Sequence, residues 1–144
     1  MPNSEVIFDQ LEKAWSEKDI DLLVSLFTED CAYIDMALGA EHHGHAGVRE
    51  FAEGVFQVMP DFHLRFPVRL VGEDRASSHW IITAHWNGEF EGVDRTGYAI
   101  EFTGLSSYRL RDGKIVENID CWDYVHMIKA FGVLPAALRD MPSA

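Results

Sequence analysis

The chain has 144 residues, of which 47% are apolar and 12% aromatic, and these values predict one domain, residues 1–144, built around one hydrophobic core. Twelve basic and 24 acidic residues give a net charge of −12, which argues against nucleic acid and anionic membrane surfaces as partners. No apolar run approaches the ~20 residues that span a bilayer, and two cysteines without a signal peptide predict reduced thiols in the cytoplasm.

Helical spacing dominates the first part of the chain. Apolar residues recur every three or four positions over residues 4–17, which predicts an amphipathic helix, and Asp19 is expected to cap a second, shorter one. A third helix is predicted over residues 48–59, where the proline at position 60 ends it. These helices are expected to turn their apolar faces towards the core.

A short strand and a histidine-containing loop are predicted between the second and third helices. Alternation over residues 31–36 places Tyr33 and Asp35 on one face of the strand. Three histidines lie in the loop expected over residues 38–47: His42, His43 and His45. Because no set of carboxylates accompanies them at a metal-ligand spacing, we expect a solvated loop near a pocket mouth and no metal site.

Period-two alternation begins after position 60 and predicts a sheet. The expected strands cover residues 62–70, 76–90, 98–111 and 114–123, and a helix is expected from residue 124. Pro67 indicates that the first of these strands lies at an edge or is bulged. Helices followed by long antiparallel strands predict an α+β fold, in which a curved antiparallel sheet wraps around the N-terminal helices to form a cone with a pocket at its open end.

The last predicted strand carries the candidate catalytic group. Asp112 and Gly113 form the turn that leads into this strand, and Asn118, Asp120 and Trp122 then share one of its faces. A carboxylate in such a position is costly to bury unless it is hydrogen-bonded or used in chemistry. The residues alone leave two interpretations open, a satisfied structural aspartate and an acid/base catalyst.

Aromatic side chains on the strands exceed what a small core needs, so some of them are candidates to line a pocket. The alternative is that most of them simply fill the core. The candidate substrate-binding residues are Asn118, Trp122, Trp86, Trp80, Phe102 and Phe56.

Five segments, in order along the chain, carry a resemblance to a known family. They lie at residues 17–30, 59–62, 88–92, 111–117 and 131–135. The first contains EKDIDLL followed by LFTED, and the others are MPDF, GEFEG, RDGKIVE and FGVLP. Together they resemble the SnoaL-like polyketide cyclases of the NTF2-like superfamily over nearly the whole chain.

The resemblance implies a cone-shaped pocket for a hydrophobic aromatic or polycyclic substrate, and a homodimer formed through one face of the sheet. In cyclases of this type an aspartate on the last strand is the general acid/base of an intramolecular aldol closure, and Asp120 matches it. No metal or organic cofactor is implied. Related epoxide hydrolases and ketosteroid isomerases place functional groups on the early strand that match Tyr33 and Asp35.

The chain departs from these relatives at two places. Where the epoxide hydrolases use an arginine and an aspartate it has Trp80 and Ile82, so their water-activating pair is incomplete. Where cyclase-like sequences carry a strand histidine, His85 is one residue early and is turned to the opposite face of the strand. Trp86 is then expected in the pocket and His85 at the subunit contact.

The leading functional hypothesis is a cofactor-independent acid/base enzyme of the polyketide-cyclase type. Asp120 is its expected proton-transfer residue, with Tyr33 and Asp35 as further catalytic groups. One alternative is a dehydratase, isomerase or epoxide hydrolase on the same scaffold that uses Asp35 with Tyr33 or His85. The other is a small-molecule-binding module without catalysis.

Overall fold

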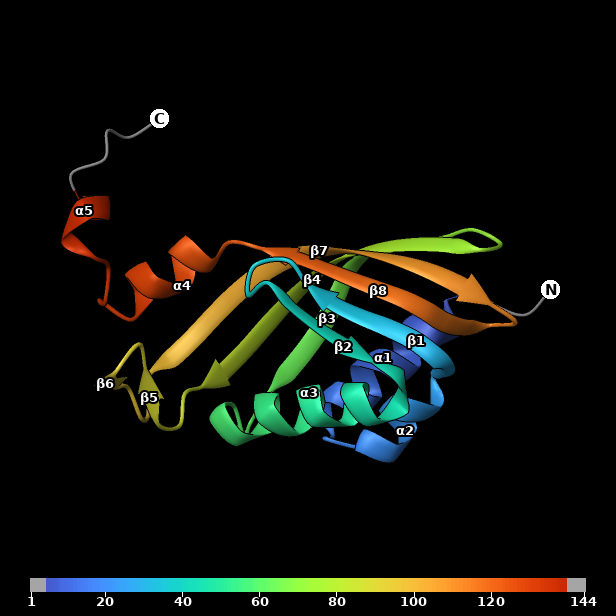
Figure 1. Ribbon diagram of the computed structural model, residues 1–144, viewed down its shortest axis with the longest axis horizontal. Coiled ribbons are helices and arrows are strands. Elements are labelled where there is room, and N and C mark those ends of the chain that lie inside the picture. The colour runs from blue at the N-terminus through green and yellow to red at the C-terminus, as the bar shows by residue number, and fades with distance from the viewer. Residues whose placement is uncertain (1–4, 140–144) are drawn as a thin grey trace.

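The structure, a computed structural model, describes residues 5–139 as a strongly curved sheet with helices packed against one side (Figure 1). The helices are α1 (Val6–Ser16), α2 (Ile20–Ser25), α3 (Gly44–Val58), α4 (Tyr124–Ala130) and α5 (Ala136–Arg139). The strands are β1 (Phe27–Asp35), β2 (Ala40–His43), β3 (His63–Val71), β4 (Arg75–His85), β5 (Glu89–Phe90), β6 (Val93–Asp94), β7 (Ala99–Arg111) and β8 (Lys114–Trp122). Helices α1 to α3 cover one side of the sheet, and α4 and α5 extend from one end of it (Figure 1). This arrangement confirms the predicted α+β fold.

Six strands form the main sheet, in the order β2-β1-β8-β7-β4-β3. All neighbours pair antiparallel except β1 and β8, which run parallel, whereas the sequence predicted an antiparallel sheet. The exception is possible because most of the chain lies between β1 and β8, so no short hairpin fixes their relative direction. Their register sets Tyr33 beside Asn118 and Asp35 beside Asp120.

Residues 40–43 form the edge strand β2, where the sequence predicted a loop. This strand pairs antiparallel with β1, and α3 begins at Gly44 rather than at residue 48. Gly44 has a φ of +67°, and a Cβ atom at Gly47 would lie 3.0 Å from the backbone of His42. The two glycines therefore allow a sharp turn from strand into helix. An alternation over so few residues is too short to be recognised in a sequence.

The long strand predicted over residues 76–90 is divided. Its first part is β4, which ends at His85, and its last residues belong to the small β5–β6 hairpin. Gly88, with a φ of +103°, separates the two. The prediction from Pro67 is confirmed, because β3 is an edge strand whose register with β4 shifts between residues 65 and 68.

The core lies between α1 and the inner face of the sheet. Buried and exposed residues alternate strictly along β7 over positions 99–109, so one face of the sheet packs inwards and the other stays open. Phe8 of α1 is 1% exposed and meets the rings of Phe66 and Tyr108 edge-on, with centroids 5.0 and 5.5 Å apart. Burying such a side chain stabilises the fold by about 1.5–3 kcal/mol.

The predicted C-terminal helix is present as α4, and Gly132, with a φ of +68°, follows its end. The single turn of α5 comes after it. Within residues 5–139, no helix is both long enough and apolar enough to cross a membrane.

Candidate active site

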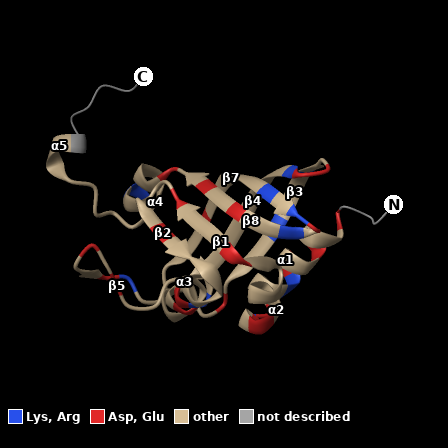
Figure 2. Cartoon of the chain, turned by 45° about the vertical axis from the view of Figure 1, so that its right-hand side comes forward, with Lys and Arg blue, Asp and Glu red and all other residues tan. Residues whose placement is uncertain are grey.

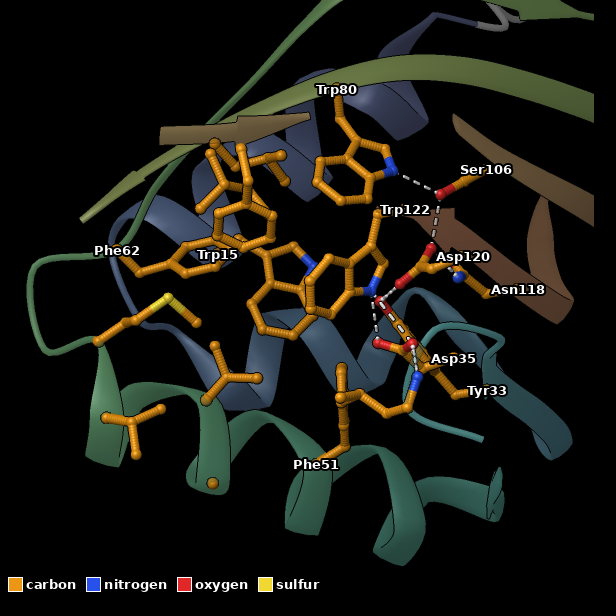
Figure 3. A pocket seen from close by; sticks show the side chains of 18 of the residues that line it. Trp15, Tyr33, Asp35, Phe51, Phe62, Trp80, Ser106, Asn118, Asp120 and Trp122 are labelled. Atoms are coloured by element: carbon orange, nitrogen blue, oxygen red, sulfur yellow. Dashed lines mark hydrogen bonds between the residues drawn. The ribbon is translucent and has the colours of Figure 1, made fainter. Parts of the chain in front are cut away.

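A cavity of about 410 Å³ opens between the inner face of the sheet and helices α1, α3 and α4. Its walls are mostly aromatic and aliphatic, and none of the described residues that line it is Lys or Arg. Figure 3 shows indole and phenyl rings around its middle and a group of polar side chains to one side. That polar group consists of Tyr33, Asp35, Ser106, Asn118 and Asp120.

Asp120 is the centre of the polar group and accepts three hydrogen bonds. The Tyr33 hydroxyl donates to its Oδ2 at 2.6 Å, while the Ser106 hydroxyl and the Asn118 Nδ2 donate to its Oδ1 at 2.5 and 2.7 Å. The donors come from β1, β7 and β8, which are adjacent in the sheet. Strand register explains the convergence, because Ser106 lies directly opposite Asp120 and Tyr33 lies beside Asn118.

Burial has the largest influence on the pKa of the Asp120 carboxyl and raises it above its ordinary value of 3.8. The three hydrogen bonds oppose this because they stabilise the carboxylate, and the negative charge of Asp35 adds a smaller upward contribution. Burial and the nearby Asp120 charge raise the pKa of Tyr33 well above its ordinary value, so that Tyr33 remains a hydrogen-bond donor. The side chain of Asp120 is only partly covered, because it borders the cavity.

Asp35 is 4% exposed and has different partners from Asp120. The indole Nε1 of Trp122 donates to both of its oxygens, at 3.0 and 3.1 Å, and the backbone N–H of Leu38 donates to Oδ1 at 3.0 Å. Asp35 therefore holds the Trp122 ring in place and anchors the turn that follows β1. The two candidate carboxylates share one cavity, but Asp35 is the one committed to holding other groups.

The predicted substrate-binding residues separate into two groups. Trp80, Trp86, Phe102, Trp122 and Asn118 all line the cavity. Phe56 does not, and its ring packs edge-on against Trp15 and Phe62, with centroids 5.6 and 6.1 Å away. Residues 55 and 58 lie on the face of α3 that borders the cavity, and position 56 lies outside that face of the helix.

His85 lies outside the cavity, whereas Trp86 borders it. The exposed imidazole Nδ1 of His85 pairs with the Asp61 carboxylate at 2.6 Å, and its backbone N–H donates to the same carboxylate. The alternative chemistry that pairs Asp35 with His85 therefore has no support from this geometry.

The three histidines of the predicted loop have separate surroundings. His42 lines the cavity with its ring 5.1 Å from that of Phe51, His43 pairs with Glu41 at 3.6 Å, and His45 contacts the Phe27 carbonyl oxygen. Among residues 5–139, no group of three His, Cys, Asp or Glu side chains is placed to hold a metal ion.

Ser106 is the site residue that sequence reasoning missed. Its hydroxyl joins Asp120 to the indole of Trp80, whose Nε1 donates to the serine Oγ at 2.8 Å. The neighbouring Ser107 has the opposite orientation and is exposed. Alternation along β7 separates the two serines into different faces, but only the pairing with β8 identifies which one meets Asp120.

Fold and site together define a class of protein, an α+β cone that encloses a largely apolar small-molecule site with a carboxylate at one end. A family model described as SnoaL-like polyketide cyclase matches residues 5–131. The chain therefore belongs to the SnoaL-like polyketide cyclase family, as predicted from its sequence.

The chain is also similar to individual proteins, one by its sequence and two by their structures. Cyclase aurE from Calcarisporium arbuscula is 32% identical over 104 residues, which are 71% of this chain and 73% of the relative. The structure of AclR from Streptomyces galilaeus, a proposed hydroxylase, is similar with a TM-score of 0.79 at 25% identity, covering 94% of this chain and 99% of AclR. A protein from Catenulispora acidiphila with a ketosteroid isomerase-like fold has a TM-score of 0.77 at 19% identity, covering 95% and 97% of the two chains. These likenesses confirm the predicted NTF2-like fold.

Proposed function

We propose that this protein is a cofactor-independent acid/base enzyme that closes a ring in a hydrophobic aromatic or polycyclic substrate by an intramolecular aldol reaction. The observation that supports this most is the placement of Asp120 at one end of an apolar cavity, with a pKa raised by burial. A carboxylate whose pKa lies closer to neutrality is a better base and, once protonated, a usable acid. The aromatic walls provide a surface on which a flat substrate can lie.

Hydrogen bonding favours Oδ2 of Asp120 as the atom that takes up the proton. A carboxylate oxygen has two lone pairs. Both lone pairs of Oδ1 are engaged, by Ser106 and Asn118, whereas Oδ2 has one donor among the described residues, the Tyr33 hydroxyl. In the proposed reaction the second lone pair of Oδ2 accepts the substrate proton.

The proposed reaction then proceeds in two steps. Asp120 removes a proton from the carbon next to a carbonyl group, and the Tyr33 hydroxyl, which is 2.6 Å from Asp120, then turns its hydrogen from the protonated Oδ2 to the enolate oxygen. The enolate carbon attacks a second carbonyl of the same molecule, a C–C bond forms, and Asp120 returns its proton to the new alkoxide. Atoms and charge balance without a redox partner, and the aspartate is regenerated as a carboxylate.

The test is a turnover assay of the wild type and Asp120→Asn on three substrates: an open-chain aromatic polyketide ester, a hydrophobic epoxide and a β-hydroxy ketone. Asp30→Asn is the matched control, because it makes the same chemical change at an exposed position outside the cavity. We expect ring closure of the ester, with a loss of about 10²-fold or more in Asp120→Asn only. Turnover of the epoxide or the hydroxy ketone instead would favour the alternative enzymes, and tight binding without turnover would favour the binding module.

We also propose that the protein is a homodimer, formed through the open face of the sheet. Leu105 in the middle of β7 is 62% exposed and Val68 of β3 is 47% exposed, although both lie on a sheet rather than in a loop. Charge along the open face of β7 changes sign, from Glu101 near one end to Arg109 near the other. Figure 2 shows basic residues of the sheet gathered towards one end.

Two copies related by a twofold axis across the strands would set the acidic end of one β7 against the basic end of the other. Leu105→Glu should therefore give a monomer in sedimentation, while Ser107→Glu, further along the same face, should weaken the dimer less. A wild-type monomer at micromolar concentration would refute the proposal.

We also propose that the protein is located in the cytoplasm, where the free thiols of Cys31 and Cys121 stay reduced.

A further inference from the structure

A chain of side chains crosses three adjacent strands and ends on Asp120. The Trp80 indole of β4 donates to Ser106 of β7 at 2.8 Å, and Ser106 contacts Asp120 of β8 at 2.5 Å. An indole N–H can only donate, so the serine Oγ accepts from it. The serine hydroxyl is thereby kept free to direct its own hydrogen at Oδ1 of Asp120.

Gly104 is what allows the Trp80 ring to reach Ser106. It lies directly between Trp80 and Trp122 in the register of the sheet, on the inner face. A Cβ atom at this position would lie 2.2 Å from Cζ2 of Trp80 and 2.7 Å from the carbonyl oxygen of Cys121. Neither neighbour can yield easily, because one is a buried ring and the other is the backbone of a paired strand. Any side chain larger than glycine must displace the indole.

We propose that Gly104 and Trp80 are positioning residues for catalysis, which fix the Ser106 hydroxyl as a permanent donor to Oδ1 of Asp120 and so direct the transferred proton to Oδ2. This inference rests on the proposed function, because it assigns a task to residues that support the same aspartate. It also gives Trp80 two roles, as a wall of the cavity and as the group that orients Ser106.

Other groups also act on Asp120 or border the same cavity, and they come from several strands and one helix. From β1, Tyr33 donates to it and Asp35 repels its charge. Asn118 of β8 donates to it, and Tyr108 of β7 lies within reach of its charge. His42 of β2 and Glu50 of α3 border the same cavity. Replacing Trp80 removes none of these contacts directly, so Trp80→Phe isolates the effect of the indole on Ser106, whereas a Cβ atom at Gly104 would also press on the β8 backbone at Cys121.

The first test uses NMR and needs no substrate. The four indole N–H signals are assigned by single Trp→Phe replacements, and their shifts are followed with pH together with the ¹³C signal of the Asp120 carboxyl. We expect the Trp80 signal to follow the titration of Asp120, and to stop doing so in Asp120→Asn and in Ser106→Ala. Trp86 is the internal control, because its indole donates to the Glu89 carbonyl oxygen. A Trp80 signal that ignores the titration of Asp120 would overturn the inference, whatever reaction the protein catalyses.

The second test compares pH–rate profiles of Trp80→Phe, Gly104→Ala and Ser106→Ala. Each should lower kcat by about tenfold, because Ser106→Ala deletes the Ser106 hydrogen bond to the charged Asp120 and the other two variants release the serine hydroxyl that makes it. Each should also move the acidic limb of the profile to higher pH, because the Ser106 hydrogen bond lowers the pKa of Asp120. Trp80→Phe keeps a ring in the cavity, so its KM should change less than its kcat.

Ser77→Ala is the matched control for these variants. Ser77 is also on β4, but it lies on the opposite face of the strand from Trp80 and does not line the cavity. We expect its pH profile to match that of the wild type. If Trp80→Phe also leaves the profile unchanged while Ser106→Ala shifts it, Ser106 acts without the indole and the inference is wrong.

Discussion

Replacing Asp120 with Asn should stabilise the fold while it removes activity. The two side chains have the same shape. The Asn Oδ1 can still accept from Ser106 and Asn118, and its Nδ2 can donate to the Tyr33 oxygen in place of the bond that Oδ2 now accepts. The substitution therefore keeps a hydrogen bond at each of these contacts, with the Tyr33 O–H turned towards the cavity, and it removes a charge whose burial is unfavourable.

The sign of the effect follows from the raised pKa of Asp120 in the folded protein. As the pH rises above the ordinary value of 3.8, the unfolded chain releases the proton of Asp120 while the folded protein retains it, so the contribution of Asp120 to wild-type stability falls until the folded pKa is passed. Asn does not ionise, so Asp120→Asn escapes this loss. At neutral pH the gain is about 1.4 kcal/mol for each pKa unit that separates the folded and unfolded states. A gain of that size raises the Tm of a chain of this length by about 4–6 °C.

The assay is thermal unfolding of both proteins between about pH 2 and pH 8, followed by near-ultraviolet circular dichroism. The stability difference should be largest at neutral pH and should close as the pH falls. Asp30→Asn is a control of opposite sign, because the hydrogen bond from Arg111 lowers the pKa of Asp30 to about 2 and its contribution is lost as the pH falls towards that value. If Asp120→Asn were less stable than the wild type at pH 7, with a gap that widens as the pH rises, ionised Asp120 would be a structural group and our reasoning would fail.

Three further predictions address neighbouring residues. Tyr33→Phe should lower kcat/KM by about 10- to 100-fold and move the acidic limb of the pH–rate profile upwards, because the hydroxyl stabilises the Asp120 carboxylate and borders the cavity in which we propose that the substrate binds. His85→Ala should leave turnover unchanged and alter the free energy of unfolding by less than about 0.5 kcal/mol, as its ion pair is exposed. Phe102→Ala should raise KM, whereas Phe56→Ala should reduce stability without changing KM, since only Phe102 lines the cavity. Steady-state kinetics and urea unfolding distinguish all of these outcomes.

The sequence determined which residues share a face of each strand. Period two alone places Tyr33 with Asp35, and Asn118 with Asp120 and Trp122, and all five line the cavity. It also separated His85 from Trp86. These predictions hold because the direction of a side chain along a strand depends only on local backbone geometry.

The sequence did not predict one short strand or the orientation of one helical side chain. Strand β2 has too few residues for its alternation to be distinguished from a loop. The position of Phe56 depends on helical phase, in which a change of one residue turns a side chain by about 100°. In both cases the local sequence pattern covers too few residues to predict the structure.

Contacts between distant residues were decided only by the tertiary structure. Tyr33 and Asp120 are separated by 87 positions, and their hydrogen bond depends on the parallel pairing of β1 with β8. Ser106 could be chosen over Ser107, and Gly104 understood as the space for an indole, only once the register of β4, β7 and β8 was known. Register is set by the packing of the whole sheet against its helices, so the pKa of Asp120 and the direction of the hydrogen bonds around it are properties of the assembled fold.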